Sequence, residues 1–166
     1  MDHFKGVRPI FAINRRADVV NLSLSGPSTP LLARLLDAAL RKGATVVGAF
    51  DQNLPNGGFP ASHPGVIAVG AEPASMAGPM YVAPGRDVLT TEPGGRWGLV
   101  NGSSYAAAHV SGLFALLKER REPLQGGLVR MSPNTQWVDP CANLLRLSGP
   151  CDCTCARVAT SAAARH

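Results

Sequence analysis

The sequence predicts an α/β protein built around a parallel sheet. Short apolar runs rich in β-branched residues flank a segment of helical periodicity, which is the pattern of a strand–helix–strand unit. Hydrophobic residues make up 45% of the 166 residues and charged residues 16%, a balance that suits a packed core. Abundant glycine (18) and proline (14) predict many turns and few long helices.

The first strand–helix–strand unit spans residues 17–50. Residues 17–24 are rich in β-formers and stop at the turn Ser25-Gly26-Pro27, so they are predicted to form a strand. Thr29 then offers an N-cap, and Pro30 suits the first helical position. One face of this helix is apolar, with Leu31, Leu32, Leu35, Leu36, Ala39 and Leu40 at helical spacing. Gly43 ends the helix, and the apolar run 44–50 predicts a buried parallel strand reached by a right-handed crossover.

The following elements are punctuated by turn residues. Residues 51–64 are rich in Pro, Gly and Asn and predict a loop, and residues 66–71 predict a third buried strand. Residues 81–91 contain a Val-Ala-Pro-Gly corner followed by a possible edge strand. Residues 92–102 are expected to be loop, and residues 104–120 carry the apolar stripe of a second helix.

Periodicity fades after Pro123, which predicts one domain over 1–123 and a weakly ordered tail over 124–166. All four cysteines lie in this tail, at Cys141, Cys151, Cys153 and Cys155. Their Cys-x-Cys-x-Cys spacing is poor for a tetrahedral chelate, so we expect no metal site and no disulfide within the folded core.

Composition argues against several functional classes. The net charge of +5 comes from scattered Arg residues, and aromatic residues make up only 5%, so we expect no nucleic-acid partner. The chain has no run of about 18 apolar residues, so we expect no membrane span. The first residues lack the apolar stretch of a secretory signal. Nothing in the sequence indicates a cofactor.

Residues 101–112 carry the most informative motif. A turn of small residues delivers Ser104 to the first turn of a helix, whose free N–H groups and dipole favour a negative charge beside the serine. Taken alone, a serine in this position usually serves as a helix cap. The surrounding residues are therefore needed to assign it a chemical role.

The longer string resembles the nucleophile signature of the subtilisin-like serine peptidases, Gly-Thr-Ser-Met-Ala-x-Pro-His-Val-x-Gly. It matches at Gly102, Ser104, Ala106, His109, Val110 and Gly112, and it departs at Ser103, Tyr105 and Ala108. The resemblance implies that Ser104 is the nucleophile. It also implies that His109 is structural and not the catalytic base, because it lies on the nucleophile's own helix.

Further segments resemble the same family in the same order. Residues 18–27 are similar to its substrate-binding strand and turn, which implies that Ser23, Leu24, Ser25 and Gly26 pair with a peptide or protein substrate and border the primary specificity pocket. Residues 46–51, 59–71 and 83–85 resemble further family segments. The resemblance implies a partial three-layer, parallel-sheet subtilisin-like fold truncated at the N-terminus, the C-terminal half of the catalytic domain. Full-length members of this family are often secreted.

The chain departs from the family in its catalytic groups. The family's triad runs Asp, His and then Ser, and segments resembling the Asp and His motifs are absent. His3 and His63 are expected to be surface residues. Without a base the serine is a poor nucleophile, so the isolated chain is expected to be inactive. The alternatives are a non-catalytic peptide-binding pseudo-peptidase and one half of a split enzyme that needs an N-terminal complementing half.

Asp51 occupies the position where the family usually has the oxyanion-hole Asn. An ionised Asp cannot donate a hydrogen bond to an oxyanion, and Asn53 is a candidate replacement donor. A truncated sheet would also expose apolar edges, so we expect the chain alone to be poorly soluble or dependent on a partner.

Overall fold

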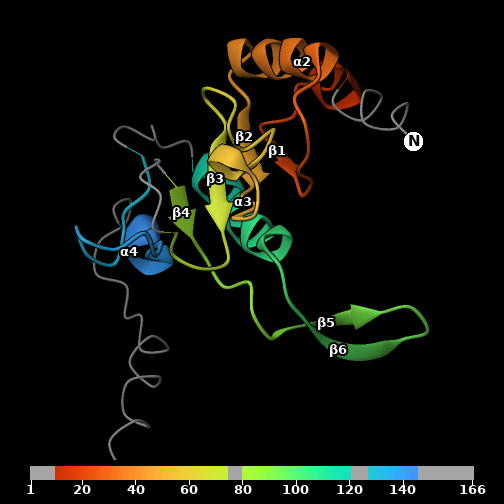
Figure 1. Cartoon of the computed structure of the whole chain (residues 1–166). Coiled ribbons are helices and arrows are strands. Elements are labelled where there is room, and N and C mark those ends of the chain that lie inside the picture. The colour runs from red at the N-terminus through yellow and green to blue at the C-terminus, as the bar shows by residue number, and fades with distance from the viewer. Residues whose placement is uncertain (1–9, 75–79, 121–126, 146–166) are drawn as a thin grey trace, which may run out of the picture.

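The computed structural model describes residues 10–74, 80–120 and 127–145. Its centre is a four-stranded parallel sheet in the order β1 (Val19–Leu22), β2 (Thr45–Ala49), β3 (Ile67–Gly70) and β4 (Met80–Val82). Helix α2 (Pro30–Arg41) covers one face and helix α3 (Ser103–Glu119) the other, as Figure 1 shows. The predicted α/β class and its three layers are confirmed.

Neighbouring residues of β2 show how the layers are held together. Val46 and Val47 point to opposite faces of the sheet because side chains alternate along a strand. Val46 joins the apolar cluster under α2, whereas Val47 joins the cluster that contains Val110 and Phe114 of α3. Both valines are fully buried, so this strand is covered on both faces, as parallel strands require.

Helix α2 begins and ends where the sequence predicts. Thr29 takes the N-cap position with an extended backbone, and Pro30 begins the helix. Leu32, Leu36 and Ala39 form its buried face, and Gly43 follows the helix with φ of +84°. The helix therefore leads directly into β2 and completes the predicted strand–helix–strand unit.

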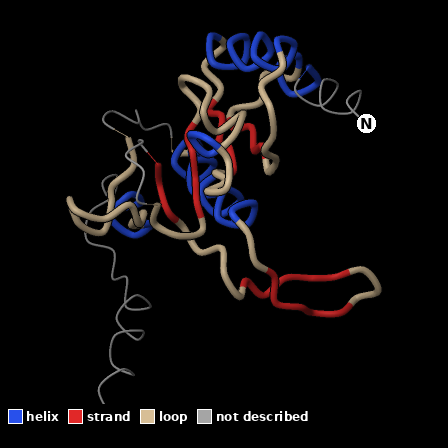
Figure 2. The backbone as a smooth tube through the Cα atoms, in the orientation of Figure 1, coloured by secondary structure: helices blue, strands red, loops and turns tan. Residues whose placement is uncertain are grey.

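The expected loop over 92–102 is wrong in part, because it contributes a strand. β5 (Val88–Glu92) and β6 (Arg96–Val100) pair as an antiparallel hairpin, and β5 is not an edge strand of the main sheet. Gly94 and Gly95 make the turn with positive φ, which glycine adopts at little cost. The hairpin projects away from the sheet (Figure 2).

Residues 127–145 belong to the stretch that was expected to be weakly ordered, yet they pack on the core. Val82 of β4 accepts from Val138 N–H at 2.9 Å and donates to the Gln136 carbonyl at 2.8 Å. Leu128 and Val138 are buried in the cluster under α3, and α4 (Pro140–Leu145) follows. The sequence missed this segment because it has no helical or strand periodicity. Residues 146–166 of the expected tail lie outside the described residues.

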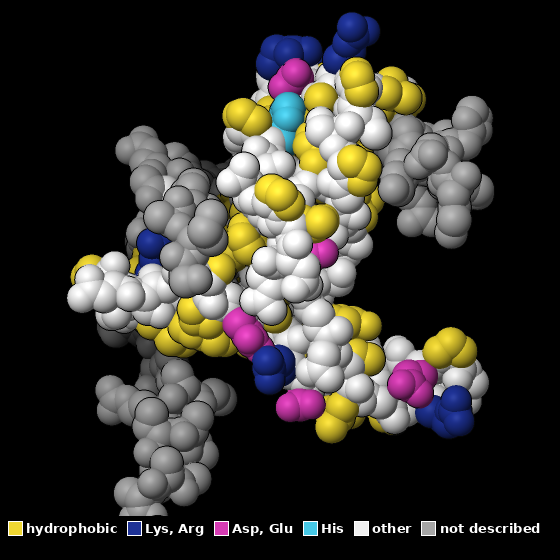
Figure 3. All heavy atoms as spheres, viewed as in Figure 1, with side chains coloured by type: hydrophobic (Ala, Val, Ile, Leu, Met, Phe, Trp, Pro, Cys, Tyr) yellow, Lys and Arg dark blue, Asp and Glu magenta, His cyan; other side chains and the backbone are white. Residues whose placement is uncertain are grey.

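Large apolar side chains are exposed on the hairpin. Leu89 is paired with Leu99 and Thr91 with Trp97, so the three large side chains share one face. Each is more than 60% exposed, and Figure 3 shows hydrophobic side chains along this projection. Within the described ranges, no helix has the length and apolar character to cross a bilayer.

Candidate active site

Ser104 is the second residue of α3. The preceding Gly102 takes the N-cap position at φ of 147°, a conformation that favours glycine, and its N–H donates to the Gly85 carbonyl at 2.7 Å. No side chain caps this helix terminus. The Tyr105 N–H donates to the Gly102 carbonyl at 3.1 Å, whereas the Ser104 N–H has no acceptor among the described residues and is available to an anion beside the serine.

The predicted substrate-binding residues, Ser23 to Gly26, follow β1 directly; we call them the docking turn. Ser23 Oγ donates to the Ser104 carbonyl at 3.2 Å and accepts from Asn21 Nδ2 at 3.1 Å. Gly26 exchanges two backbone hydrogen bonds with Phe59, both 3.0 Å long. The main-chain N–H and carbonyl of Gly26 are therefore already hydrogen-bonded within the protein. The main-chain groups of Ser23 to Ser25 form no hydrogen bond with any other part of the described chain.

Asp51 follows β2 and lies at the same end of the sheet. Asp51 Oδ1 accepts from Asn53 N at 3.0 Å and Asn53 Nδ2 at 3.1 Å, and Oδ2 accepts from Ser25 Oγ at 3.1 Å. The Asn53 N–H is the largest cause that lowers the pKa of Asp51 below its ordinary value; partial burial opposes the shift, and the two side-chain bonds add to it. Asp51 is therefore ionised at neutral pH. Asn53 was the candidate replacement donor to an oxyanion, but its side-chain Nδ2 already donates to the Asp51 carboxylate.

The two described histidines, His63 and His109, have partners other than the Ser104 hydroxyl. His109 Nδ1 lies 3.0 Å from the Pro84 carbonyl, so this ring ties α3 to the corner after β4. His63 was expected at the surface, but its side chain is only 12% exposed and pairs with Asp37 of α2 at 3.0 Å. His3 lies outside the described residues. Within the described part of the chain, no His or Asp side chain hydrogen-bonds the Ser104 hydroxyl.

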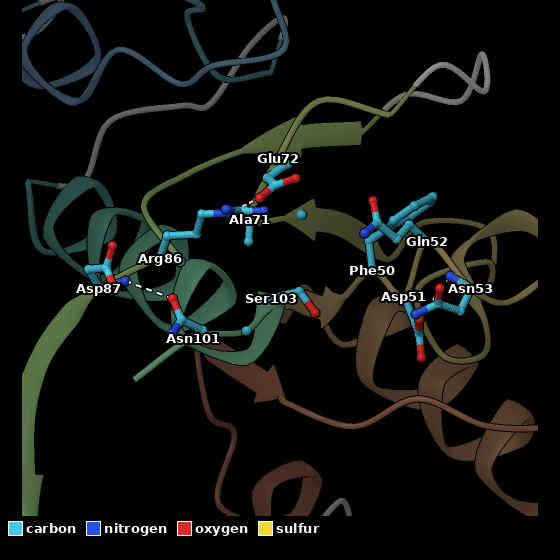
Figure 4. Close-up of a pocket in the computed structure, with 13 residues that line it drawn as sticks. Phe50, Asp51, Gln52, Asn53, Ala71, Glu72, Arg86, Asp87, Asn101 and Ser103 are labelled. Carbon is cyan, nitrogen blue, oxygen red and sulfur yellow. Dashed lines mark hydrogen bonds and ion pairs between the residues drawn. The ribbon is translucent and has the colours of Figure 1, made fainter. Parts of the chain in front are cut away.

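A cleft of about 570 Å³ opens beside the start of α3 (Figure 4). It is lined by the segments that follow three parallel strands and by the turn into α3: residues 50–53, 70–72, 85–87 and 101–103. Arg86 forms an ion pair with Glu72 across it, and Asn101 Oδ1 accepts from Asp87 N at 2.9 Å. Sequence reasoning did not single out these polar residues, although the carboxyl ends of parallel strands are where such sheets bind ligands.

Of the four cysteines, only Cys141 lies within the described residues. Cys141 lies in α4 and is disulfide-bonded, so the expectation that no cysteine of the folded part forms a disulfide is wrong. Cys151, Cys153 and Cys155 lie outside the described residues.

Comparison with known proteins gives a consistent result. The Subtilase family matches residues 4–136, which is most of the chain and extends past the predicted domain limit at residue 123. Subtilisin amylosacchariticus of Bacillus subtilis subsp. amylosacchariticus is 34% identical over 135 residues, covering 72% of this chain and 35% of that protein. The major intracellular serine protease of Bacillus subtilis (strain 168) is 34% identical over 130 residues, covering 68% of this chain and 40% of that protein.

A solved structure supports the fold. The prenylagaramide maturation protease PagA superposes with a TM-score of 0.68 at 20% identity, covering 88% of this chain and 67% of that chain. The chain thus spans well under half the length of the two curated relatives named above. Because the family match covers most of the chain, the conclusion is plain: this chain belongs to the Subtilase family of serine peptidases.

Proposed function

We propose that this chain is the nucleophile-bearing, C-terminal half of a serine endopeptidase domain, with Ser104 as the nucleophile. One observation carries the proposal: Ser104 stands at an uncapped helix terminus and is joined directly to the docking turn through the Ser23 hydroxyl. A peptide that pairs with the free main-chain groups of Ser23 to Ser25 would run past this serine.

The chemistry is acyl transfer. The Ser104 hydroxyl attacks the carbonyl carbon of the peptide bond while its proton passes to a base, and the resulting oxyanion accepts from the Ser104 N–H. Collapse of this intermediate breaks the C–N bond and releases the amine, which takes the proton. Water then hydrolyses the acyl-serine ester and restores the hydroxyl.

The isolated chain is expected to be inactive, because no His in its described part hydrogen-bonds the Ser104 hydroxyl as a base would. The Asp and His that the family uses would come from a complementing N-terminal half, supplied either by the same polypeptide or by a partner chain. Loss of triad members typically costs several orders of magnitude in kcat, on the order of 10⁴- to 10⁶-fold. The substrates would be peptides or proteins.

Asp51 favours a second candidate, a peptide-binding pseudo-peptidase. An ionised carboxylate at the oxyanion position repels the charge that develops in the transition state and cannot donate a hydrogen bond. In this second candidate function the docking turn still binds peptides, and replacing Ser104 does not change the affinity for them.

The test is covalent labelling of Ser104 by a fluorophosphonate, a reagent that reports an activated serine. The chain is treated alone and after mixing with an N-terminal half of a subtilase that carries Asp and His, and Ser104→Ala serves as the control. We expect labelling only in the mixture and none in Ser104→Ala. Absence of labelling in the mixture, with peptide binding that survives Ser104→Ala, would overturn the catalytic reading in favour of the pseudo-peptidase.

A further inference from the structure

We infer that this site selects substrates with glycine, or at most a very small residue, at the position that supplies the scissile carbonyl. The inference rests on the proposed function and names the substrate class of the same site. Its basis is the space between the docking turn and Asp51, which the exposed Ser25 side chain and the Asp51 carboxylate bridge by a hydrogen bond.

The position of that substrate residue follows from the reaction geometry. A peptide paired with Ser23 to Ser25, with its carbonyl carbon at Ser104 and its oxygen beside residue 51, places one residue between the docking turn and the loop after β2. The side chain of this residue needs room between those two segments. The contacts of Ser25, Phe50 and Asp51 therefore determine what fits.

A hydrogen bond crosses this space directly. Ser25 Oγ of the docking turn donates to Asp51 Oδ2 at 3.1 Å, which holds the two segments together. The carboxylate is itself held in place, because its other oxygen accepts two bonds from Asn53. A side chain entering between the segments would have to break or bypass the Ser25–Asp51 bond.

The loop over residues 57–59 closes the space further. The Asp51 N–H donates to the Gly57 carbonyl at 2.9 Å, and Gly26 is bridged to Phe59, so this loop bonds both segments at once. The Phe50 ring lies over Gly57 so closely that a Cβ at Gly57 would overlap it. A Cβ at Gly58 would lie 3.4 Å from the Cβ of Ser25, which is van der Waals contact.

Two hollows lie near the space between the docking turn and Asp51. The cleft of about 570 Å³ is lined by Phe50 and Asp51 but by no residue of the docking turn. A second hollow of about 360 Å³ is lined by Gly26, Gly58 and Phe59 but by no residue from 50–53. Neither of these two hollows is lined by both Ser25 and Asp51, the two residues whose side chains bridge the docking turn and the loop after β2.

The experiment compares three peptides that differ only at the scissile position, with Gly, Ala or Phe, on the chain complemented by the Asp- and His-bearing half. We expect kcat/KM for the Gly peptide to exceed that for the Phe peptide by about 100-fold, since bulk is rejected sterically. Phe50→Gly combined with Ser25→Gly is expected to reduce this ratio at least about tenfold by opening the space.

Two controls separate folding from selectivity. Phe11→Gly makes the same change at an exposed residue and is expected to leave the ratio unchanged. Ser25→Ala removes only the cross-link and is expected to lower the ratio by a smaller factor than the double variant. Equal kcat/KM values for the Gly and Phe peptides, or an unchanged ratio in the double variant, would overturn the inference.

Failure of the proposed function gives a different result. In that case Ser104 is not labelled in the complemented chain, and selectivity is read instead from calorimetric binding of the three peptides to the Ser104→Ala chain. Preferential binding of the Gly peptide, relaxed by the double variant, supports the inference. Equal binding of the Gly and Phe peptides overturns it.

Discussion

Asp51 is the candidate-site residue whose ionisation the structure defines. Its carboxylate accepts hydrogen bonds from Asn53 and Ser25, and these bonds are stronger to the ionised group than to the protonated one. Because folding lowers its pKa, Asp51 binds its proton more weakly in the folded state than in the unfolded state. Its stabilising contribution is therefore present above the unfolded pKa and is lost as the pH falls through the folded pKa.

We predict that Asp51→Asn abolishes this acid-dependent part of the stability. In the unaltered chain the free energy of unfolding should fall between the ordinary Asp pKa and the lowered folded value, and the variant should lack that component. Urea unfolding at a series of acidic pH values measures it, with the complementing half present if the chain needs it to fold. Identical pH dependence in both proteins would contradict the prediction. The same variant restores a donor at the oxyanion position and should label faster with a fluorophosphonate in the complemented chain.

At the scale of elements, a buried amide links two parts of the segment 127–145. Asn143 of α4 is 2% exposed, and its Oδ1 accepts from Val129 N at 2.8 Å. Its Nδ2 donates to the carbonyls of Val129 at 2.9 Å and Asp139 at 2.6 Å. The amide thus joins α4 to Val129, next to the bridge between Arg130 and Val138.

We predict that Asn143→Ala destabilises the fold by about 1–3 kcal/mol, because the Val129 N–H loses its acceptor. The Val129 and Asp139 carbonyls keep the backbone N–H groups of Asp139 and Asn143 as partners. Asn134→Ala, the same change at an exposed residue, is the matched control and should cost less than about 0.5 kcal/mol. Chemical denaturation of the chain in its folded, complemented form measures both. Equal effects of the two substitutions would show that the Asn143 bonds contribute nothing specific.

At the scale of the whole molecule, two surfaces lack a covering layer within the described residues. β1 stands at the end of the sheet order, so its outer edge is unpaired, and the hairpin exposes Leu89, Trp97 and Leu99 on one face. Parallel strands are normally flanked by other elements, and large exposed apolar faces usually mark interaction surfaces.

We predict that the isolated chain self-associates or precipitates and that the complementing half suppresses this. Sedimentation of the chain with and without that half measures the effect. A variant with Leu89, Trp97 and Leu99 all changed to Thr should be more soluble alone, because Thr keeps the strand propensity and removes the apolar face. A soluble monomer of the unaltered chain that unfolds cooperatively would contradict the prediction.

The sequence by itself determined the local elements and the order of the motifs. The Thr29–Pro30 start of α2, the buried strands and the serine at the start of α3 follow from short-range rules of capping, periodicity and turn chemistry. The order of residues 127–145 was missed because it comes from contacts with distant residues, such as that of Val138 with Val82. The hairpin was missed because its glycine turn has the composition of a loop.

Only the tertiary structure decided how the candidate site is closed. The Ser25–Asp51 bond joins residues 26 positions apart, and the Ser23–Ser104 bond joins residues 81 positions apart. Neither has a signature in the sequence, because packing of parallel strands brings their carboxyl ends to one edge whatever their spacing along the chain. The sequence gives the identity of each side chain, but which side chains bond one another depends on how the folded sheet brings them together.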